Sequence, residues 1–231
     1  MNALRGLPRV FIPGAKPDAR IELPKEESRK FEKVLRLSNG DLIAVLPNDG
    51  TVICAEFHGD HAVPVSVESP NTESPIYLTI AQALPKGDKL EEIVRACTEL
   101  GVSAFIFFVS DRSVVQWSPE KRADRIRRLE TIAREACEVS FRTRLPEMQF
   151  LPSFEAVIRA EPDLRALSEV ESEAATLGAK RDRETLAVGP EGGWSPRELE
   201  LIGDRGITLG PRVLRVDHAA PAAAALRLLS L

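Results

Sequence analysis

The sequence predicts an α/β domain with a mostly parallel sheet, preceded by a small β-rich domain. Over the first 75 residues, short runs rich in β-branched residues are separated by turn signals such as 38–41 and 47–50. Later, short apolar segments alternate with long amphipathic ones, which is typical of parallel strands joined by helices. Between the two patterns, residues 68–75 contain two prolines and no aliphatic or aromatic side chain, the composition of a linker. We therefore expect one domain at 1–72 and a second at 73–231.

The first domain is expected to contain four strands and one helix. The strands are predicted at 9–12, 41–46, 51–57 and 62–67, and their spacing suggests a small barrel. The helix is predicted at 26–37, where four apolar residues recur close to helical periodicity: Phe31, Val34, Leu35 and Leu37.

The second domain is expected to alternate strands with helices. Its strands are predicted at 76–84, 104–109, 164–167, 185–188 and 208–209. Its helices are predicted at 88–100, 119–139, 196–202 and 219–229. Such alternation implies a mostly parallel sheet with helices on both faces.

Composition excludes several classes of protein. The chain has 231 residues, 43% of them hydrophobic and 5% aromatic, and its 31 Lys+Arg against 35 Asp+Glu give a net charge of -4. A disordered chain, a collagen-like repeat and a small disulfide scaffold are therefore excluded. The acidic balance also excludes nucleic-acid binding through bulk positive charge. Binding of nucleic acid by a local basic region is not excluded, because residues 1–36 and 112–144 each contain nine Lys/Arg and five Asp/Glu.

The three cysteines, the amino terminus and the apolar runs predict the compartment in which the protein works. Cys54, Cys97 and Cys137 are far apart and odd in number, which favours packed free thiols in a reducing compartment. The amino terminus has no apolar signal-peptide segment, and the longest apolar run, 104–109, is far below the roughly 20 residues of a membrane span. We expect a cytoplasmic protein with no membrane partner.

The strongest local motif is Gly189-Pro190-Glu191-Gly192-Gly193, directly after an apolar strand. Ser195, Pro196 and Glu198 then give an N-cap, a first-turn proline and a third-position carboxylate for the next helix. Main-chain amides of this loop can hold a small ligand at the carboxyl end of a strand. The alternative is a tight turn without a ligand.

A second strand-to-loop segment, 209–220, leads into an alanine-rich helix. Two such loops after strands of one sheet can form opposite walls of one cleft. Neither matches the dinucleotide fingerprint or the phosphate-binding P-loop. His58 and His61 lie at a turn without a further ligand, so we expect no metal site.

The predicted helix from residue 119 is rich in arginine. Its cations are interleaved with carboxylates, so a solvated helix face is one interpretation. The other is phosphate recognition, for which the arginine guanidinium is well suited.

Taken in order along the chain, six motifs resemble the RsmE family of bacterial ribosomal RNA methyltransferases. They are Arg9-Val10-Phe11, Lys33-Val34-Leu35-Arg36-Leu37, Lys86-Gly87-Asp88-Lys89-Leu90-Glu91, Glu99-Leu100-Gly101-Val102, Gly189-Pro190-Glu191-Gly192-Gly193 and Leu209-Gly210-Pro211-Arg212-Val213-Leu214-Arg215. A GPEGG loop alone would be weak, but this ordered set over nearly the full length is specific.

The resemblance implies a PUA-like RNA-binding β-barrel followed by a SPOUT domain, an α/β fold with a deep C-terminal trefoil knot. It also implies a homodimer through the knot, S-adenosyl-L-methionine as cofactor, and N3 of a uridine in small-subunit (16S) ribosomal RNA as target, in free rRNA or in the assembled subunit. The cofactor residues that it implies are Gly189, Pro190, Glu191, Gly192, Gly193, Leu209, Gly210, Arg212, Val213, Leu214 and Arg215.

Some positions depart from the family pattern. The usual Arg-x-Glu-Thr-Ala is Arg215-Val216-Asp217-His218-Ala219 here, and the Gln of Glu-Gln-Ser-Gly-Arg is Val139. The family's histidine in the first domain falls on Lys30.

Methyl transfer to uridine N3 needs an in-line nucleophile and removal of the N3 proton. We hypothesise that Arg142 places a positive charge beside the uracil, that Asp217 or Glu191 orients groups around the cofactor, and that His218 is the base. Phosphate contacts are expected from Arg9, Lys30, Arg36, Lys86, Lys89, Arg112, Arg125 and Arg128. With few aromatic residues for stacking, RNA shape and a flipped uridine are the expected basis of recognition.

Three alternatives stay open at this point. The first is a SPOUT methyltransferase with another RNA target, such as a ribose 2'-hydroxyl or a guanine. The second is a non-catalytic RNA-binding ribosome assembly factor. A regulatory domain that binds a nucleotide-like ligand is the third, but it leaves the first domain unexplained.

Overall fold

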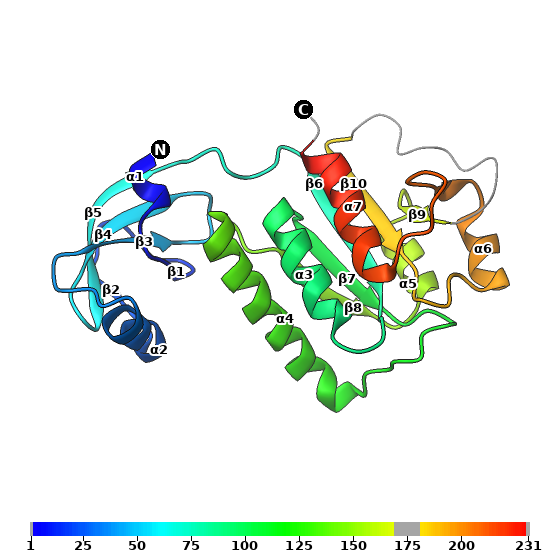
Figure 1. The fold of residues 1–231 in the computed structure, drawn as a ribbon, viewed down its shortest axis with the longest axis horizontal. Helices are drawn as coiled ribbons and strands as arrows, with labels where there is room; N and C mark the ends of the chain where they lie inside the picture. Colours follow the sequence, from blue (N-terminus) through cyan, green and yellow to red (C-terminus); the bar gives the residue numbers. More distant parts are fainter. Residues whose placement is uncertain (1, 169–180, 230–231) are drawn as a thin grey trace. The chain divides into compact units, whose positions relative to one another are not determined.

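A computed structural model describes residues 2–168 and 181–229, which form two compact units (Figure 1). The first unit takes the chain up to Glu73 together with Cys137–Leu145, and the second takes Ser74–Ala136 and the chain from Pro146 onward. Residues 137–145, which the sequence analysis assigned to the second domain, therefore group with the first unit.

The first unit is a five-stranded sheet with short helices. Its elements are α1 (Asn2–Arg5), β1 (Arg9–Phe11), β2 (Ile21–Glu22), α2 (Lys25–Arg29), the π-helical turn η1 (Lys30–Val34), β3 (Leu42–Leu46), β4 (Val52–Phe57) and β5 (His61–Glu68). The strand order is β1-β3-β4-β5-β2. β1 pairs with β3 in parallel, and the other pairs are antiparallel.

The sheet of the first unit buries side chains on both faces. One face packs around Phe31 of η1 and Phe57 of β4, whose rings meet edge to face with centroids 5.6 Å apart. On the other face, Phe11 and Leu46 pack with Cys137 and Phe141. These contacts explain why residues 137–145 group with the first unit, which local sequence patterns could not indicate.

The helix predicted at 26–37 is wrong at its carboxyl end. The chain leaves helical geometry after Val34, Arg36 adopts a left-handed φ of 57°, and the Leu37 amide donates to the Phe31 carbonyl at 2.9 Å. The expected apolar face is also incorrect, because Val34 and Leu35 are exposed and Phe31 is fully buried. The π-helical turn shifts the register of side chains that a 3.6-residue period assumes.

The second unit contains the predicted parallel sheet. Its elements are β6 (Tyr77–Ala83), α3 (Lys89–Leu100), β7 (Ala104–Phe108), α4 (Pro119–Ser140, with its last turn in the first unit), β8 (Glu147–Leu151), α5 (Phe154–Ala160), β9 (Arg165–Leu167), β10 (Arg183–Val188), α6 (Pro196–Ile202), the 3₁₀ turn η2 (Gly203–Arg205), β11 (Gly206–Ile207) and α7 (Val216–Leu228). The strand order is β11-β9-β10-β6-β7-β8, and every pair is parallel. The α/β expectation is confirmed.

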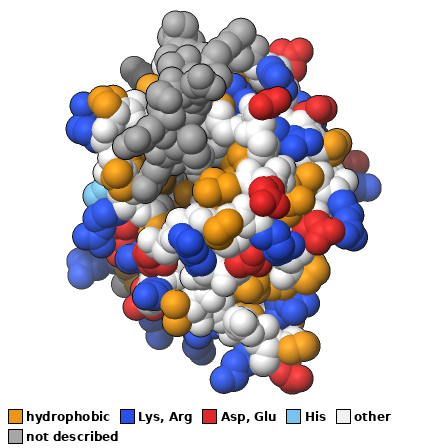
Figure 2. Space-filling model, turned by 90° about the vertical axis from the view of Figure 1, so that its right-hand side faces the viewer, with side chains coloured by type: hydrophobic (Ala, Val, Ile, Leu, Met, Phe, Trp, Pro, Cys, Tyr) orange, Lys and Arg blue, Asp and Glu red, His pale blue; other side chains and the backbone are white. Residues whose placement is uncertain are grey.

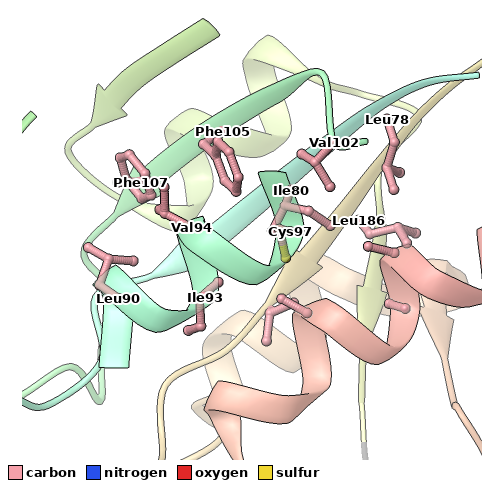
Figure 3. Close-up of a cluster of buried hydrophobic side chains, with 14 of the residues drawn as sticks. Leu78, Ile80, Leu90, Ile93, Val94, Cys97, Val102, Phe105, Phe107 and Leu186 are labelled. Carbon is pink, nitrogen blue, oxygen red and sulfur yellow. The ribbon is translucent and has the colours of Figure 1, made fainter. Parts of the chain in front are cut away.

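Helices cover both faces of this sheet. α3 and α7 lie against each other on one face, where Leu78, Ile80 and Leu186 of the strands meet Ile93 and Cys97 of α3 (Figure 3). The other face packs against α5 and α6. Burial on both faces explains why the central strands are nearly continuous apolar runs.

The structure corrects three further expectations. The strand predicted at 208–209 is wrong: β11 ends at Ile207, and Thr208 Oγ1 then bonds to the Gly210 carbonyl at 2.9 Å, which turns the chain. The helix predicted at 219–229 begins earlier, at Val216. β8 and α5 had no predicted counterpart, because β8 is a half-exposed strand without a clear alternation of apolar residues.

Each cysteine is buried and free, as expected. Burial raises the pKa of the Cys137 thiol to about 12, so this thiol is protonated at neutral pH and is not a nucleophile.

A buried carboxylate ties the carboxyl end of α7 to the sheet. Glu184 of β10 accepts from Arg227 Nη2 at 2.9 Å and is also paired with Arg165. The side chains of Glu184 and Arg227 are 2% and 3% exposed. This interaction holds the last helix to the amino end of β10.

We predict that Glu184→Ala lowers the free energy of unfolding by about 3–5 kcal/mol, because it removes the carboxylate that faces two poorly solvated guanidinium groups. Urea titration followed by circular dichroism measures the change. Asp124→Ala removes an exposed ion pair with Arg127 and should cost at most about 1 kcal/mol. Equal losses in the two variants would contradict the prediction.

Candidate functional site

The candidate site lies at one edge of the six-stranded sheet. Because all strands of this sheet are parallel, their carboxyl ends meet at a single edge. The loop 189–193 follows β10 there, and the segment 208–215 follows β11 at the same edge. The loops after β6 and β7 leave from it as well.

The GPEGG loop is tightly packed against the protein. A Cβ on Gly189 would lie 3.1 Å from Cε2 of Trp194, and one on Gly192 would lie 3.2 Å from Cβ of Arg112. Gly193 has a left-handed φ of 67°, and its amide donates to the Pro190 carbonyl at 2.9 Å. The first two glycines thus make room for neighbouring side chains, and the third permits the turn.

Trp194 anchors the end of this loop. Its Nε1 donates to the carbonyl of Leu167, the last residue of β9, at 2.7 Å. Its ring packs against Phe108 and Phe154, with centroids 6.2 Å and 4.5 Å away. The loop is therefore fixed to the neighbouring strand β9 and to the core below it.

Glu191 faces the loop after β6. Its Oε1 accepts from Lys89 Nζ at 2.7 Å and from the Lys86 amide at 3.0 Å. Burial alone would raise the pKa of Glu191, but the hydrogen bonds from Lys89 and from backbone amides outweigh it and leave the pKa lowered. Lys89, predicted to bind RNA, is thus engaged by a predicted cofactor residue.

Arg112 also contacts the GPEGG loop. Its Nη1 donates to the Gly192 carbonyl at 2.9 Å. Sequence analysis predicted Arg112 as a phosphate ligand, and the structure brings it to the cofactor loop.

The second loop is open to solvent. Residues 210–215 are exposed, and Val213 among them is 72% exposed. The backbone amides of Val213 and Leu214 make no hydrogen bond to the described residues. Leu209, in contrast, packs partly against the core beneath α7. This loop therefore presents free amides beside exposed apolar side chains.

Asp217 and His218 lie together in the first turn of α7. Asp217 Oδ1 accepts from Arg215 Nε at 3.3 Å, and Asp217 Oδ2 lies 3.7 Å from His218 Nε2. Burial would raise the pKa of Asp217, but its own backbone amide, Arg215 and His218 together lower it. The Asp217 side chain is 11% exposed and that of His218 is 68% exposed, so the imidazole is accessible.

Arg142 belongs to the first unit and is 4% exposed. Its Nη2 and Nε donate to Glu73 Oε2 at 2.9 Å and 3.1 Å. The other oxygen of Glu73 accepts from the Thr143 and Arg144 amides at 2.7 Å and 3.1 Å. The structure therefore pairs the predicted catalytic Arg142 with a carboxylate of its own unit.

The other residues of the first unit that were predicted to bind RNA differ in whether their side chains have a partner. Arg9 Nη1 donates to the Glu138 carbonyl at 2.6 Å, and Lys30 pairs with the Glu138 carboxylate at 3.1 Å. Burial would lower the pKa of Lys30, but Glu138 and Glu27 raise it overall, so Lys30 is charged. Arg36 is exposed at its left-handed position.

On α4, Arg125 and Arg128 line a hollow with Trp117 and the amino end of α3. Arg128 is paired with Glu91 of α3. Figure 2 shows one face of the molecule, on which Lys and Arg side chains are interspersed with Asp and Glu. Among the described residues on that face, cations and carboxylates are therefore intermixed.

Sequence reasoning missed two residues near this edge. Gln82 of β6 is fully buried beside Val188; its Nε2 donates to the Ala83 carbonyl at 2.9 Å, and its Oε1 has no partner among the described residues. Glu198 was expected only as a helix cap, yet it also binds the loop after β7. A polar residue inside an apolar strand was the one available signal for Gln82.

Within 2–168 and 181–229, no helix has the length and apolar character needed to cross a membrane. In the same part of the chain, no group of three His, Cys, Asp or Glu side chains is arranged to hold a metal ion.

Comparison with known proteins supports one family. Residues 72–228 match the family described as RNA methyltransferase domain. The ribosomal RNA small subunit methyltransferase E of Bacillus subtilis (strain 168) is 33% identical over 214 residues, or 84% of each chain. The protein of that name from Synechocystis sp. is 34% identical over 94% of this chain and 75% of its own length.

A solved structure gives the same result for the fold. The ribosomal RNA small subunit methyltransferase E of Neisseria gonorrhoeae, crystallised with S-adenosyl methionine, superposes with a TM-score of 0.85 at 27% identity. The superposition covers 95% of this chain and 96% of that chain. The resemblance found in the sequence motifs is confirmed, and the chain belongs to the ribosomal RNA small subunit methyltransferase E family.

Proposed function

We propose that this protein transfers the methyl group of S-adenosylmethionine to N3 of a uridine in small-subunit ribosomal RNA. The observation that carries the proposal is membership of the family over most of both chains, at 33% identity to the Bacillus subtilis protein. The Neisseria gonorrhoeae relative with the same fold binds S-adenosyl methionine. The uridine target comes from the resemblance of the sequence motifs.

The finer features of the fold belong to the same proposal. The five-stranded sheet of the first unit would be the PUA-like RNA-binding barrel, and the C-terminal segment through α7 would form the trefoil knot. A homodimer would pair through the knotted region. In support of the dimer, the apolar side chains of Val213 and Leu214 are exposed, and a second subunit would cover them.

The residues at the sheet edge fit the cofactor chemically. S-adenosylmethionine has a flat base, hydroxyl groups, and an amino acid end with a carboxylate and an ammonium. The free amides of Val213 and Leu214 suit its acceptors, and the unpartnered Oε1 of the buried Gln82 suits a donor. When bound, the cofactor supplies an electrophilic methyl group on a sulfonium sulfur.

The chain's own residues must then manage the proton on uridine N3. His218 is exposed and lies beside Asp217, which makes it the candidate base. Asp217 stays ionised through its lowered pKa, so its carboxylate can orient the imidazole. For Arg142 to stabilise the uracil anion, its guanidinium must reach the base, whereas in this structure it is paired with Glu73.

Nucleoside mapping tests the proposed target. Small-subunit rRNA from a strain that lacks the enzyme is incubated with the protein and S-adenosylmethionine, digested, and analysed by mass spectrometry. We expect one N3-methyluridine per rRNA. A methylated ribose or guanine would instead show a different RNA target, and absence of cofactor binding by calorimetry would indicate a non-catalytic assembly factor.

The role of Arg142 has its own test. We predict that Arg142→Ala lowers the methylation rate about 100-fold or more, because a charge stabilising the developing anion is lost, while the Kd for S-adenosylmethionine stays unchanged. Glu73→Gln is the matched control, since it keeps an acceptor for the Thr143 and Arg144 amides and removes the charge opposite Arg142. If both variants lose activity equally, Arg142 serves the structure and not the uracil.

Phosphate contacts predict a response to salt. We expect rRNA affinity to fall as salt rises, and Arg125→Gln to reduce the slope of log K against log salt by about 1, because one phosphate contact is lost. Arg127→Gln is the control on the same helix, since Arg127 is already paired with Asp124. Filter binding between low and moderate salt measures both; a slope that Arg125→Gln leaves unaltered would remove this residue from the interface.

A further inference from the structure

The carboxylate of Glu198 is fully buried at the amino end of α6, just after the GPEGG loop. It accepts three hydrogen bonds: from the Ser195 amide at 2.9 Å, from Ser110 Oγ at 3.0 Å and from the Asp111 amide at 3.1 Å. A capping box accounts for the first of these only. The other two come from the loop after β7, so Glu198 joins that loop to the start of α6.

Asp111 makes a second connection between the same two segments. Its Oδ2 accepts from Ser195 Oγ at 2.6 Å, and its Oδ1 accepts from Arg197 Nη2 at 2.7 Å. These hydrogen bonds, first from Arg197 and then from Ser195, lower the pKa of Asp111. The loop after β7 is thus held on α6 by a buried carboxylate and a half-exposed one.

Arg112 extends this connection to the GPEGG loop itself. The turn that carries it is closed by the Ser113 amide, which donates to the Ser110 carbonyl at 2.9 Å. From that turn, Arg112 Nη1 reaches the Gly192 carbonyl at 2.9 Å, and its Cβ fills the space that a side chain on residue 192 would take. The turn that places Arg112 is therefore the one that Glu198 and Asp111 hold on α6.

We propose that Glu198 and Arg112 are positioning residues of the methyl-transfer site. Glu198 fixes the turn 110–113 against α6, and Arg112 on that turn holds the Gly192 carbonyl, so the loop 189–193 has its binding shape before the cofactor arrives. The inference rests on the proposed function in one respect, that this loop binds S-adenosylmethionine. A preformed loop binds more tightly because it does not lose conformational entropy on binding.

The experiment measures the Kd for S-adenosylmethionine by calorimetry in Arg112→Ala and Glu198→Gln. Each variant should bind about tenfold more weakly or worse, a loss of about 1.4 kcal/mol or more, because the loop must then be ordered on binding. The rate at saturating cofactor should change less than the Kd. The double variant should be no worse than Glu198→Gln alone, because both residues act through one contact. Arg112→Lys, which keeps the charge and the packed Cβ, should restore part of the affinity.

Two controls separate positioning from stability. Arg205→Ala removes another exposed arginine that donates to backbone carbonyls, those of Pro162 and Leu201, away from the loop. Glu184→Gln alters a buried carboxylate in the same sheet, at the opposite end of β10. Below their unfolding temperatures, both should bind the cofactor within twofold of the unaltered protein.

Hydrogen exchange in the cofactor-free protein gives an independent measurement. The amides of residues 191–193 should exchange faster in Arg112→Ala than in Arg205→Ala. Unchanged cofactor affinity and unchanged exchange in Arg112→Ala would overturn the inference while leaving the proposed function standing. If the unaltered protein fails to bind S-adenosylmethionine, the proposed function falls, and faster exchange then still supports the positioning of the loop.

Discussion

The parallel pairing of β6 with β7 and β10 is the constraint on which the rest of the second unit depends. In this register Gln82 of β6 lies between Val188 of β10 and Phe107 of β7. The three strands therefore end at nearly the same level. Since the strands are parallel, the loops that follow them all leave one edge. Helices on both faces bury the strands, which makes the sheet a rigid base for that edge.

At the edge of this sheet, the loops that follow the strands are held in place by hydrogen bonds to carboxylates. Glu191 accepts hydrogen bonds from the Lys89 ammonium and the Lys86 amide. Glu198 accepts them from the Ser110 hydroxyl and from the Asp111 and Ser195 amides. Short loops cannot bury enough apolar surface to hold one shape, whereas ionised groups in partly dry surroundings form strong hydrogen bonds. The candidate site is therefore shaped by contacts between loops that leave different strands.

The same contacts change how the basic segments should be interpreted. The cations predicted to contact RNA include several that already have a partner in their own unit: Arg9, Lys30, Lys89, Arg112 and Arg128. Arg36 and Arg125 keep exposed side chains. Five of the eight cations predicted to contact RNA are thus held by groups of their own unit, so the presence of a Lys or Arg in a basic segment does not by itself place it on a phosphate.

Local patterns were enough for elements whose signals lie within a few residues. Ser195, Pro196 and Glu198 predict the start of α6, and the helix predicted at 88–100 corresponds to α3; the structure confirms both. The order of motifs also identified the family. The proposed roles of Asp217 and His218 in the reaction stay a prediction, although the structure brings these two side chains together.

Only the tertiary structure decided the order of the strands, the grouping of residues 137–145 with the first unit, and the partners of Arg142 and Glu198. The bond between Ser110 and Glu198 joins residues 88 positions apart, and that between Arg142 and Glu73 spans 69. Helical periodicity and capping motifs describe neighbours along the chain, where backbone geometry alone determines which side chains meet. Pairings across such separations depend on how the sheet and its helices pack. The sequence by itself therefore determined most helices and strands and the family, and tertiary packing determined which charged groups face one another.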